Sequence, residues 1–107
     1  EDHQIKSKIS DISDIDTDGQ FVFFAKLKEK FLKEGKTQKM NKSLNLRVED
    51  DTGQIFCTID RFKYPKIGKP IFESASEGDW FLIKGKMNQR FRKIYVDRVR
   101  KLDISDQ

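Results

Sequence analysis

Cysteine, histidine and tryptophan are nearly absent from this chain of 107 residues, which contains one of each. The single cysteine, Cys57, excludes an internal disulfide and is typical of a reducing compartment. Because His3 is the only histidine, the sequence offers neither the ligands of a zinc site nor the base of a catalytic triad. We therefore expect no catalytic residue, no bound metal, no cofactor, and no enzymatic activity of this chain on its own.

One aspartate-rich motif, Asp14-x-Asp16-x-Asp18-Gly19, matches the first half of a calcium-binding EF-hand loop. The twelfth position of such a loop must supply a bidentate carboxylate, and here it is Ala25. A phenylalanine-rich stretch follows instead of a helix. We interpret these aspartates as turn or helix-cap residues.

Long hydrophobic runs and a signal-peptide pattern are also missing. No stretch approaches the roughly 20 apolar residues that cross a bilayer. Together with the cysteine usage, this predicts a cytoplasmic protein without a membrane partner. The chain begins at Glu1 rather than Met, which predicts a domain of a longer protein. Its nine phenylalanines argue against disorder, and its length fits one domain.

Alternating apolar and polar residues indicate strands along most of the chain. The stretches 44–49 and 55–60 alternate clearly, and Asp50–Gly53 between them is typical of a hairpin turn. The continuously apolar start of 80–88 predicts burial on both faces, with Trp80 in the core, and Cys57 is also expected there. In the last strand, the pattern predicts Arg98 on the same face as Ile94 and Val96. We expect five strands, at about 20–33, 44–49, 55–60, 80–88 and 93–101.

Proline is scarce, and both prolines fall in the connection 61–78. Pro65, Gly68 and Pro70 exclude a long helix or a central strand there and leave only Ile71–Ser76 for a short helix. Five strands with one short helix between the third and fourth predict an all-β, Greek-key OB-fold barrel. We place an acidic lead-in at 1–19, the barrel at 20–102 and a tail at 103–107. The lead-in isoleucines, spaced at three to four, predict a weak helical turn or a segment that packs on the barrel.

Charge is distributed very unevenly. The first basic segment, 21–48, carries eight lysines and arginines against two glutamates, and the second basic segment, 80–102, carries eight against one aspartate. The segments 1–20, 49–79 and 103–107 are acidic. Each basic segment contains a strand, a polar loop and a second strand. If the two lie side by side, they form a positive surface that suits a polyanion.

The two loops that an OB-fold uses for oligonucleotides, between strands 1 and 2 and between strands 4 and 5, fall inside the two basic segments. In the first loop, Lys33, Lys36 and Lys39 are expected to contact phosphate. The alternative is that they are solvated surface lysines.

The second loop contains Arg90-Phe91-Arg92, an aromatic ring between two guanidinium groups. This order predicts a plane for base stacking beside two phosphate partners. The alternative is that Phe91 folds back and caps the end of the barrel.

The third strand offers a further aromatic residue. If Ile55 and Cys57 point inward, then Phe56 and Thr58 point outward, onto the surface that binds ligands in OB-folds, with Asn45 and Arg47 beside them on the second strand. The alternative is a register shifted by one residue, which would bury Phe56.

Two motifs add a family resemblance. The sequences Val48–Ile55 and Glu77–Lys86 resemble the OB domain of the bacterial replicative DNA polymerase III alpha subunit, which is similar to the anticodon-binding domains of some tRNA synthetases. The resemblance covers roughly residues 9–102. It implies binding of single-stranded nucleic acid without catalysis by this domain.

The sequence therefore predicts a module for single-stranded nucleic acid, with DNA favoured over RNA, within a larger replication or repair polymerase. An RNA- or tRNA-binding OB module is one alternative. Another is an OB scaffold for protein–protein contact, docking through the acidic lead-in or the connection 61–78.

Overall fold

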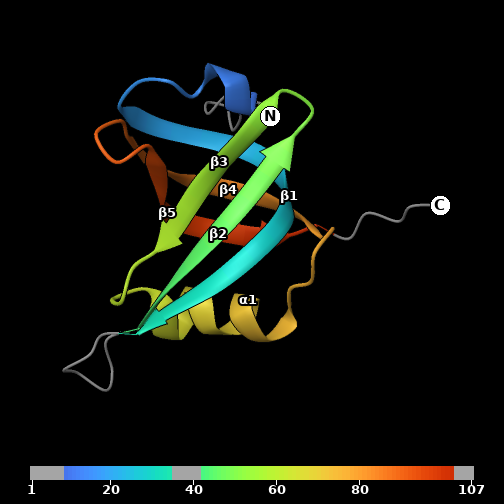
Figure 1. Ribbon diagram of the computed structural model, residues 1–107, viewed down its shortest axis with the longest axis vertical. Helices are drawn as coiled ribbons and strands as arrows, with labels where there is room; N and C mark the ends of the chain where they lie inside the picture. Colours follow the sequence, from blue (N-terminus) through green and yellow to red (C-terminus); the bar gives the residue numbers. More distant parts are fainter. Residues whose placement is uncertain (1–8, 35–41, 103–107) are drawn as a thin grey trace, which may run out of the picture.

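Five strands form a closed barrel in the computed structural model, which describes residues 9–34 and 42–102. Their order around the barrel is β1-β2-β3-β5-β4 (Figure 1). Only β3 and β5 pair in parallel; the other neighbours are antiparallel. This closed barrel, with a short helix between β3 and β4, confirms the predicted OB-fold. The strands are β1 (Gly19–Glu34), β2 (Lys42–Asp50), β3 (Gly53–Ile59), β4 (Trp80–Asn88) and β5 (Lys93–Lys101).

The longest strand, β1, pairs with β4 along its first half and with β2 along its second half. An irregularity between Leu27 and Glu29 separates the two halves. Before it, Phe23 and Leu27 are fully buried; after it, Phe31 is 46% exposed. The bulge therefore reverses which alternate residues face the core.

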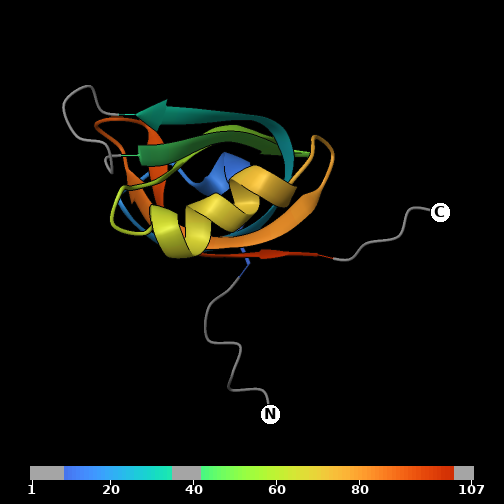
Figure 2. The ribbon, with the colours of Figure 1, turned by 90° about the horizontal axis from the view of Figure 1, so that it is seen from below.

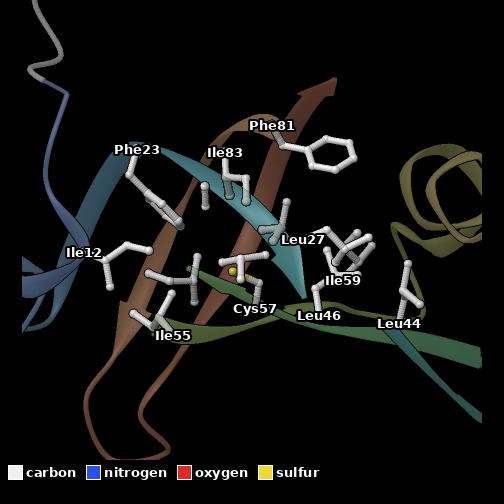
Figure 3. Packing of buried hydrophobic residues seen from close by; sticks show 14 of the residues in the cluster. Ile12, Phe23, Leu27, Leu44, Leu46, Ile55, Cys57, Ile59, Phe81 and Ile83 are labelled. Atoms are coloured by element: carbon white, nitrogen blue, oxygen red, sulfur yellow. The ribbon is translucent and has the colours of Figure 1, made fainter. Parts of the chain in front are cut away.

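The core follows the alternation of β2 and β3. Leu44, Leu46, Ile55, Cys57 and Ile59 all point into the barrel (Figure 3). Cys57 is fully buried, as predicted, and burial raises the pKa of its thiol. The thiol therefore acts as a small apolar group that fills space in the core.

The connection between β3 and β4 is more helical than the sequence predicted. A π-helical turn, η2 (Tyr64–Gly68), runs directly into α1 (Lys69–Ser74) across one end of the barrel (Figure 2). The expectation that helix begins only at Ile71 is wrong, because each proline lies in the first turn of its element, where no intrahelical N–H bond is needed. No helix in the described ranges is long and apolar enough to span a bilayer.

The described part of the lead-in, from residue 9 onward, packs against the other end of the barrel (Figure 1). It forms one 3₁₀ turn, η1 (Ile12–Asp14), and both Ile12 and Ile15 are buried. The Ile12 backbone N–H donates to Asp50 Oδ2 at 2.9 Å, which ties the lead-in to the β2–β3 turn. Ile12 and Ile15 of the lead-in therefore belong to the barrel's core. This confirms the prediction that the segment packs on the barrel.

Strands β4 and β5 differ from the predicted burial. Only one face of β4 is buried, and Trp80 is half-buried rather than in the core. The register between the two strands shifts at Lys84/Gly85. A Cβ atom at Gly85 would lie 2.5 Å from the Tyr95 carbonyl oxygen, so glycine permits this close approach. Beyond the shift Val99 packs on the core and Arg98 is exposed, which corrects the predicted side of Arg98.

Candidate nucleic-acid interface

The outer face of β2 and β3, extended by β1 and β5, contains four of the ten residues predicted to bind a ligand. Strand pairing places these four, with four others, in two rows that run across the strands. The rows are Glu29–Arg47–Phe56–Lys93 and Phe31–Asn45–Thr58–Tyr95. We call these eight residues the β2–β3 face.

Phe56 lies outward on β3, as predicted. Its side chain is 48% exposed, whereas its neighbours Ile55 and Cys57 are buried. The alternative of a shifted register is therefore wrong. A large ring left half in water contributes little to the core and is available to a flat ligand.

Phe91 lies at the β4–β5 turn and is 56% exposed, so it does not cap the barrel. Its backbone N–H is held by Asn88 Oδ1, and the Arg90 guanidinium lies 5.5 Å from the centre of its ring. Arg92 closes the turn in the left-handed region, at φ 55°. The turn thus presents a ring and two cations together, as the sequence predicted.

Phe56 and Phe91 line the same hollow, which has a volume of about 580 Å³. We call it the aromatic hollow. Ile12, Ile15 and Asp16 of the lead-in form another part of its wall, together with Arg92. The lead-in also holds the turn, since Asp18 Oδ1 accepts a hydrogen bond from the Gln89 N–H at 2.7 Å. The fold therefore brings together two rings that are far apart in the sequence.

Thr58 and Asn45 lie side by side but are less available than predicted. Thr58 is only 9% exposed, and its hydroxyl donates to Asn45 Oδ1 at 2.7 Å. Thr58 therefore lies in the predicted outward register, but its side chain is covered and offers little surface to a ligand. Since Asn45 accepts through its oxygen, its NH₂ group remains to donate to a ligand.

Arg47 is held by two neighbours on this face. Its Nε lies 3.1 Å from Glu29 Oε1, and its Nη1 donates to Gln54 at 2.8 Å. The ion pair neutralises much of the charge that the sequence assigned to phosphate binding. A role for Arg47 in binding stays a prediction, now limited to the remaining amino group of the guanidinium.

The predicted lysines of the first loop fall at the edge of the described part. Lys33 is exposed near the end of β1, in outward register opposite Ser43. Lys36 and Lys39 lie outside the described residues. Their contact with phosphate stays a prediction.

Phe31 is a candidate that sequence reasoning missed. Alternation continued from Phe23 and Leu27 would bury it, but the bulge in β1 turns it outward beside Asn45. The only signal in the sequence is Leu32, which packs against the core after the bulge and takes the inward place that Phe31 would otherwise have. Tyr95, half-buried at the end of the same row, adds a second ring there.

Comparison with known proteins supports the fold and goes no further. A chain in the crystal structure of yeast Stn1 and Ten1 is similar, with a TM-score of 0.65 and 10% sequence identity. The match covers 79% of this chain but only 43% of that one. No family model and no curated protein matches the sequence. The structural likeness therefore agrees with an OB-type barrel, and the resemblance to the polymerase subunit stays a prediction.

Proposed function

We propose that this chain is a non-catalytic module that binds single-stranded nucleic acid, with DNA favoured over RNA. Unpaired bases would stack on Phe56 and Phe91 at the aromatic hollow. Base–aromatic stacking contributes about 1–3 kcal/mol per base and tolerates any sequence, because every base has a π-face. The proposal depends mainly on one observation: two exposed rings share this hollow beside Arg92.

Positive charge beside the rings supports the same proposal. Arg90, Arg92 and Lys93 have no carboxylate within ion-pair distance among the residues that the structure describes. Three phosphates neutralised on a single strand would give a slope of about −2 for log affinity against log salt. Phe31 and Asn45 extend the same surface across β1 and β2.

The setting in a longer protein is part of the proposal. The resemblance of Val48–Ile55 and Glu77–Lys86 to the polymerase OB domain supports a place in a replication or repair polymerase. In that setting the module would hold the single strand while a separate domain performs the chemistry.

Fluorescence anisotropy with labelled oligo-dT and oligo-U, each at two salt concentrations, tests the proposal. We expect both to bind, oligo-dT more tightly, and both affinities to fall steeply as salt is added. Tighter binding of oligo-U would favour the RNA-binding alternative, because only RNA offers the 2′-hydroxyl as a contact. Absence of binding to either oligonucleotide at low salt would contradict the proposed function.

A further inference from the structure

A second hollow lies over the outer face of β1, β4 and β5, away from the β2–β3 face, and reaches Ile67 of η2 and the core-packed Val99. It has a volume of about 430 Å³. Its lining contains no acidic residue. We call it the aliphatic groove, and it consists of four aliphatic side chains and three cations. These are Val22, Ile67, Leu82 and Val99, with Lys84, Arg98 and Arg100.

Strand pairing explains why these side chains meet. Lys84 on β4 pairs with Val22 on β1 and with Arg98 on β5. Leu82, two residues earlier, pairs with Arg100. In Figure 1, β4 and β5 lie behind β2 and β3, and this groove and the aromatic hollow have no lining residue in common.

The three cations of the groove have no carboxylate within ion-pair distance in the described ranges 9–34 and 42–102. Strand β5 pairs with β3 only over Lys93–Tyr95, so the rest of that edge lacks a partner strand. Charged side chains on such an edge commonly prevent unwanted strand pairing. That explanation accounts for exposed arginines on β5. It does not account for Val22 and Leu82, which are half-buried on the outer face, whereas Ile67 and Val99 also pack against the core.

We propose that the aliphatic groove binds an extended segment of a partner protein in which acidic and apolar side chains alternate. Arg98 and Arg100 are two positions apart on β5, about 7 Å along a strand. Carboxylates at alternate positions of an extended peptide have the same spacing. The apolar side chains between them would cover the floor around Leu82, and burial of that floor supplies affinity.

The composition of the floor separates this ligand from a nucleic acid. Bases stack on aromatic rings, and the groove has none, whereas the aromatic hollow has two. Aliphatic side chains instead suit leucine-like side chains of a peptide. The inference goes beyond the proposed function and does not depend on it, since the two surfaces share no residue.

Heteronuclear NMR titration of the intact chain tests the proposal. One ligand is a synthetic peptide of about ten residues that alternates Asp and Leu, long enough to span a strand; the other is oligo-dT. We expect the peptide to shift the amide signals of Val22, Leu82 and Val99, and oligo-dT to shift those of Phe56 and Phe91. Matched peptides with Lys in place of Asp, or Ser in place of Leu, should shift none of them.

Charge reversal then assigns the site. Arg98→Glu with Arg100→Glu should lower affinity for the Asp-Leu peptide by about tenfold or more, because like charges would face each other. The control pair, Arg90→Glu with Arg92→Glu, should leave peptide affinity unchanged while weakening oligo-dT. If the reversed variant unfolds, Arg98→Gln with Arg100→Gln replaces it, with a smaller loss expected.

Three outcomes would overturn the proposal. The first is an absence of shifts at about 1 mM peptide, which marks the weak end of specific binding. The second is a set of shifts confined to the aromatic hollow. The third is displacement of the peptide from the groove by oligo-dT. The last outcome would identify the groove as a second nucleic-acid surface. Failure of oligo-dT to bind would contradict the proposed function alone and leave the peptide result intact.

Discussion

The two basic segments carry equal numbers of cations and use them differently. In the first basic segment, Lys26 and Lys28 lie 4.0 and 3.7 Å from Glu49, and Arg47 lies 3.1 Å from Glu29. In the second basic segment, only Lys101 has a carboxylate partner in the described part of the chain, Asp79 at 3.3 Å. Half of the first segment's described cations therefore face a carboxylate within the fold, whereas most of those of the second segment are available to a ligand.

Lys30 shows the difference most clearly. It lies in inward register opposite Leu46, and its ammonium donates to the Phe72 and Ala75 carbonyl oxygens at 2.5 and 2.6 Å. These carbonyls lie at the end of α1, where the last turn of a helix lacks intrahelical donors and attracts a cation. Counting positive residues in the sequence thus overstates the surface available to phosphate, because some cations stabilise the fold.

The largest expected effect tests whether rings or charge dominate binding. Phe56→Ala combined with Phe91→Ala should weaken oligo-dT binding by about 2–6 kcal/mol, one to three for each stacked base. The melting temperature should hardly change, since both rings are exposed. Phe24→Ala is the control, because Phe24 is 40% exposed on β1 but pairs with Leu82 on the other side of the barrel. Normal binding by the double variant would leave charge as the whole basis of affinity.

The structural role of the first segment leads to a stability prediction. Lys30→Met keeps the apolar stem but removes the donor to the end of α1. It should lower the free energy of unfolding by about 1.5–3 kcal/mol, the usual range for a hydrogen bond to a charged group. Urea denaturation measures this change. Lys33→Met, at an exposed position of the same strand, should change the stability by less than about 0.5 kcal/mol. Equal stabilities would show that Lys30 is merely a surface charge.

A matched pair of charge variants compares the two segments directly. At 0.1 M salt, each phosphate contact contributes about fivefold to affinity for a single strand, so Arg90→Gln with Arg92→Gln should weaken oligo-dT about 25-fold, near 1.9 kcal/mol. The salt slope should become less negative by about 1.4. Lys26→Gln with Lys28→Gln should change affinity less than about twofold, because both lysines face glutamates. Equal losses in the two variants would remove the distinction between the segments.

Sequence reasoning was reliable where alternation runs without interruption. The pattern of β2 and β3 gave the buried set and the outward position of Phe56, because a strand's period of two leaves one choice of face. It failed at the two register shifts, which hid Phe31 and reversed Arg98 and Val99. No characteristic residue type marks the shift in β1, so its place depends on tertiary packing. The shift in β4 falls at Gly85, and a glycine inside a strand is a signal that alternation alone does not use.

The partners of the cations could not be predicted for a similar reason. Glu49 and Glu77 lie in the acidic segment 49–79 and reach Lys28 only once the barrel closes. The prolines misled about where the short helix begins: Pro65 and Pro70 were expected to leave only Ile71–Ser76 for it, but both occupy first-turn positions that tolerate proline. Local rules identified the elements, and long-range pairing decided which charges remain free.

The smallest expected effect concerns Asp50, a carboxylate of the same acidic segment that holds the lead-in behind the aromatic hollow. Partial burial by itself would raise its pKa, but hydrogen bonds from Thr52, Ile12 and Gly53 outweigh it and lower the pKa below the ordinary 3.8. A carboxylate with a lowered pKa in the folded state stabilises the fold above its unfolded pKa and loses that contribution as pH falls.

Asp50→Asn should therefore be less stable than the parent chain by a constant amount at neutral pH, and the gap should narrow as pH falls below about 4. Melting temperatures of both proteins at pH 7 and pH 3 measure it. Asp51→Asn is the control, because the carboxylate of Asp51, next to Asp50 in the chain, is exposed and makes no hydrogen bond among the described residues. A gap that stays unchanged down to pH 3 would show that the Asp50 charge does not hold the lead-in. In that case the wall of the aromatic hollow would depend on the buried Ile12 and Ile15 alone.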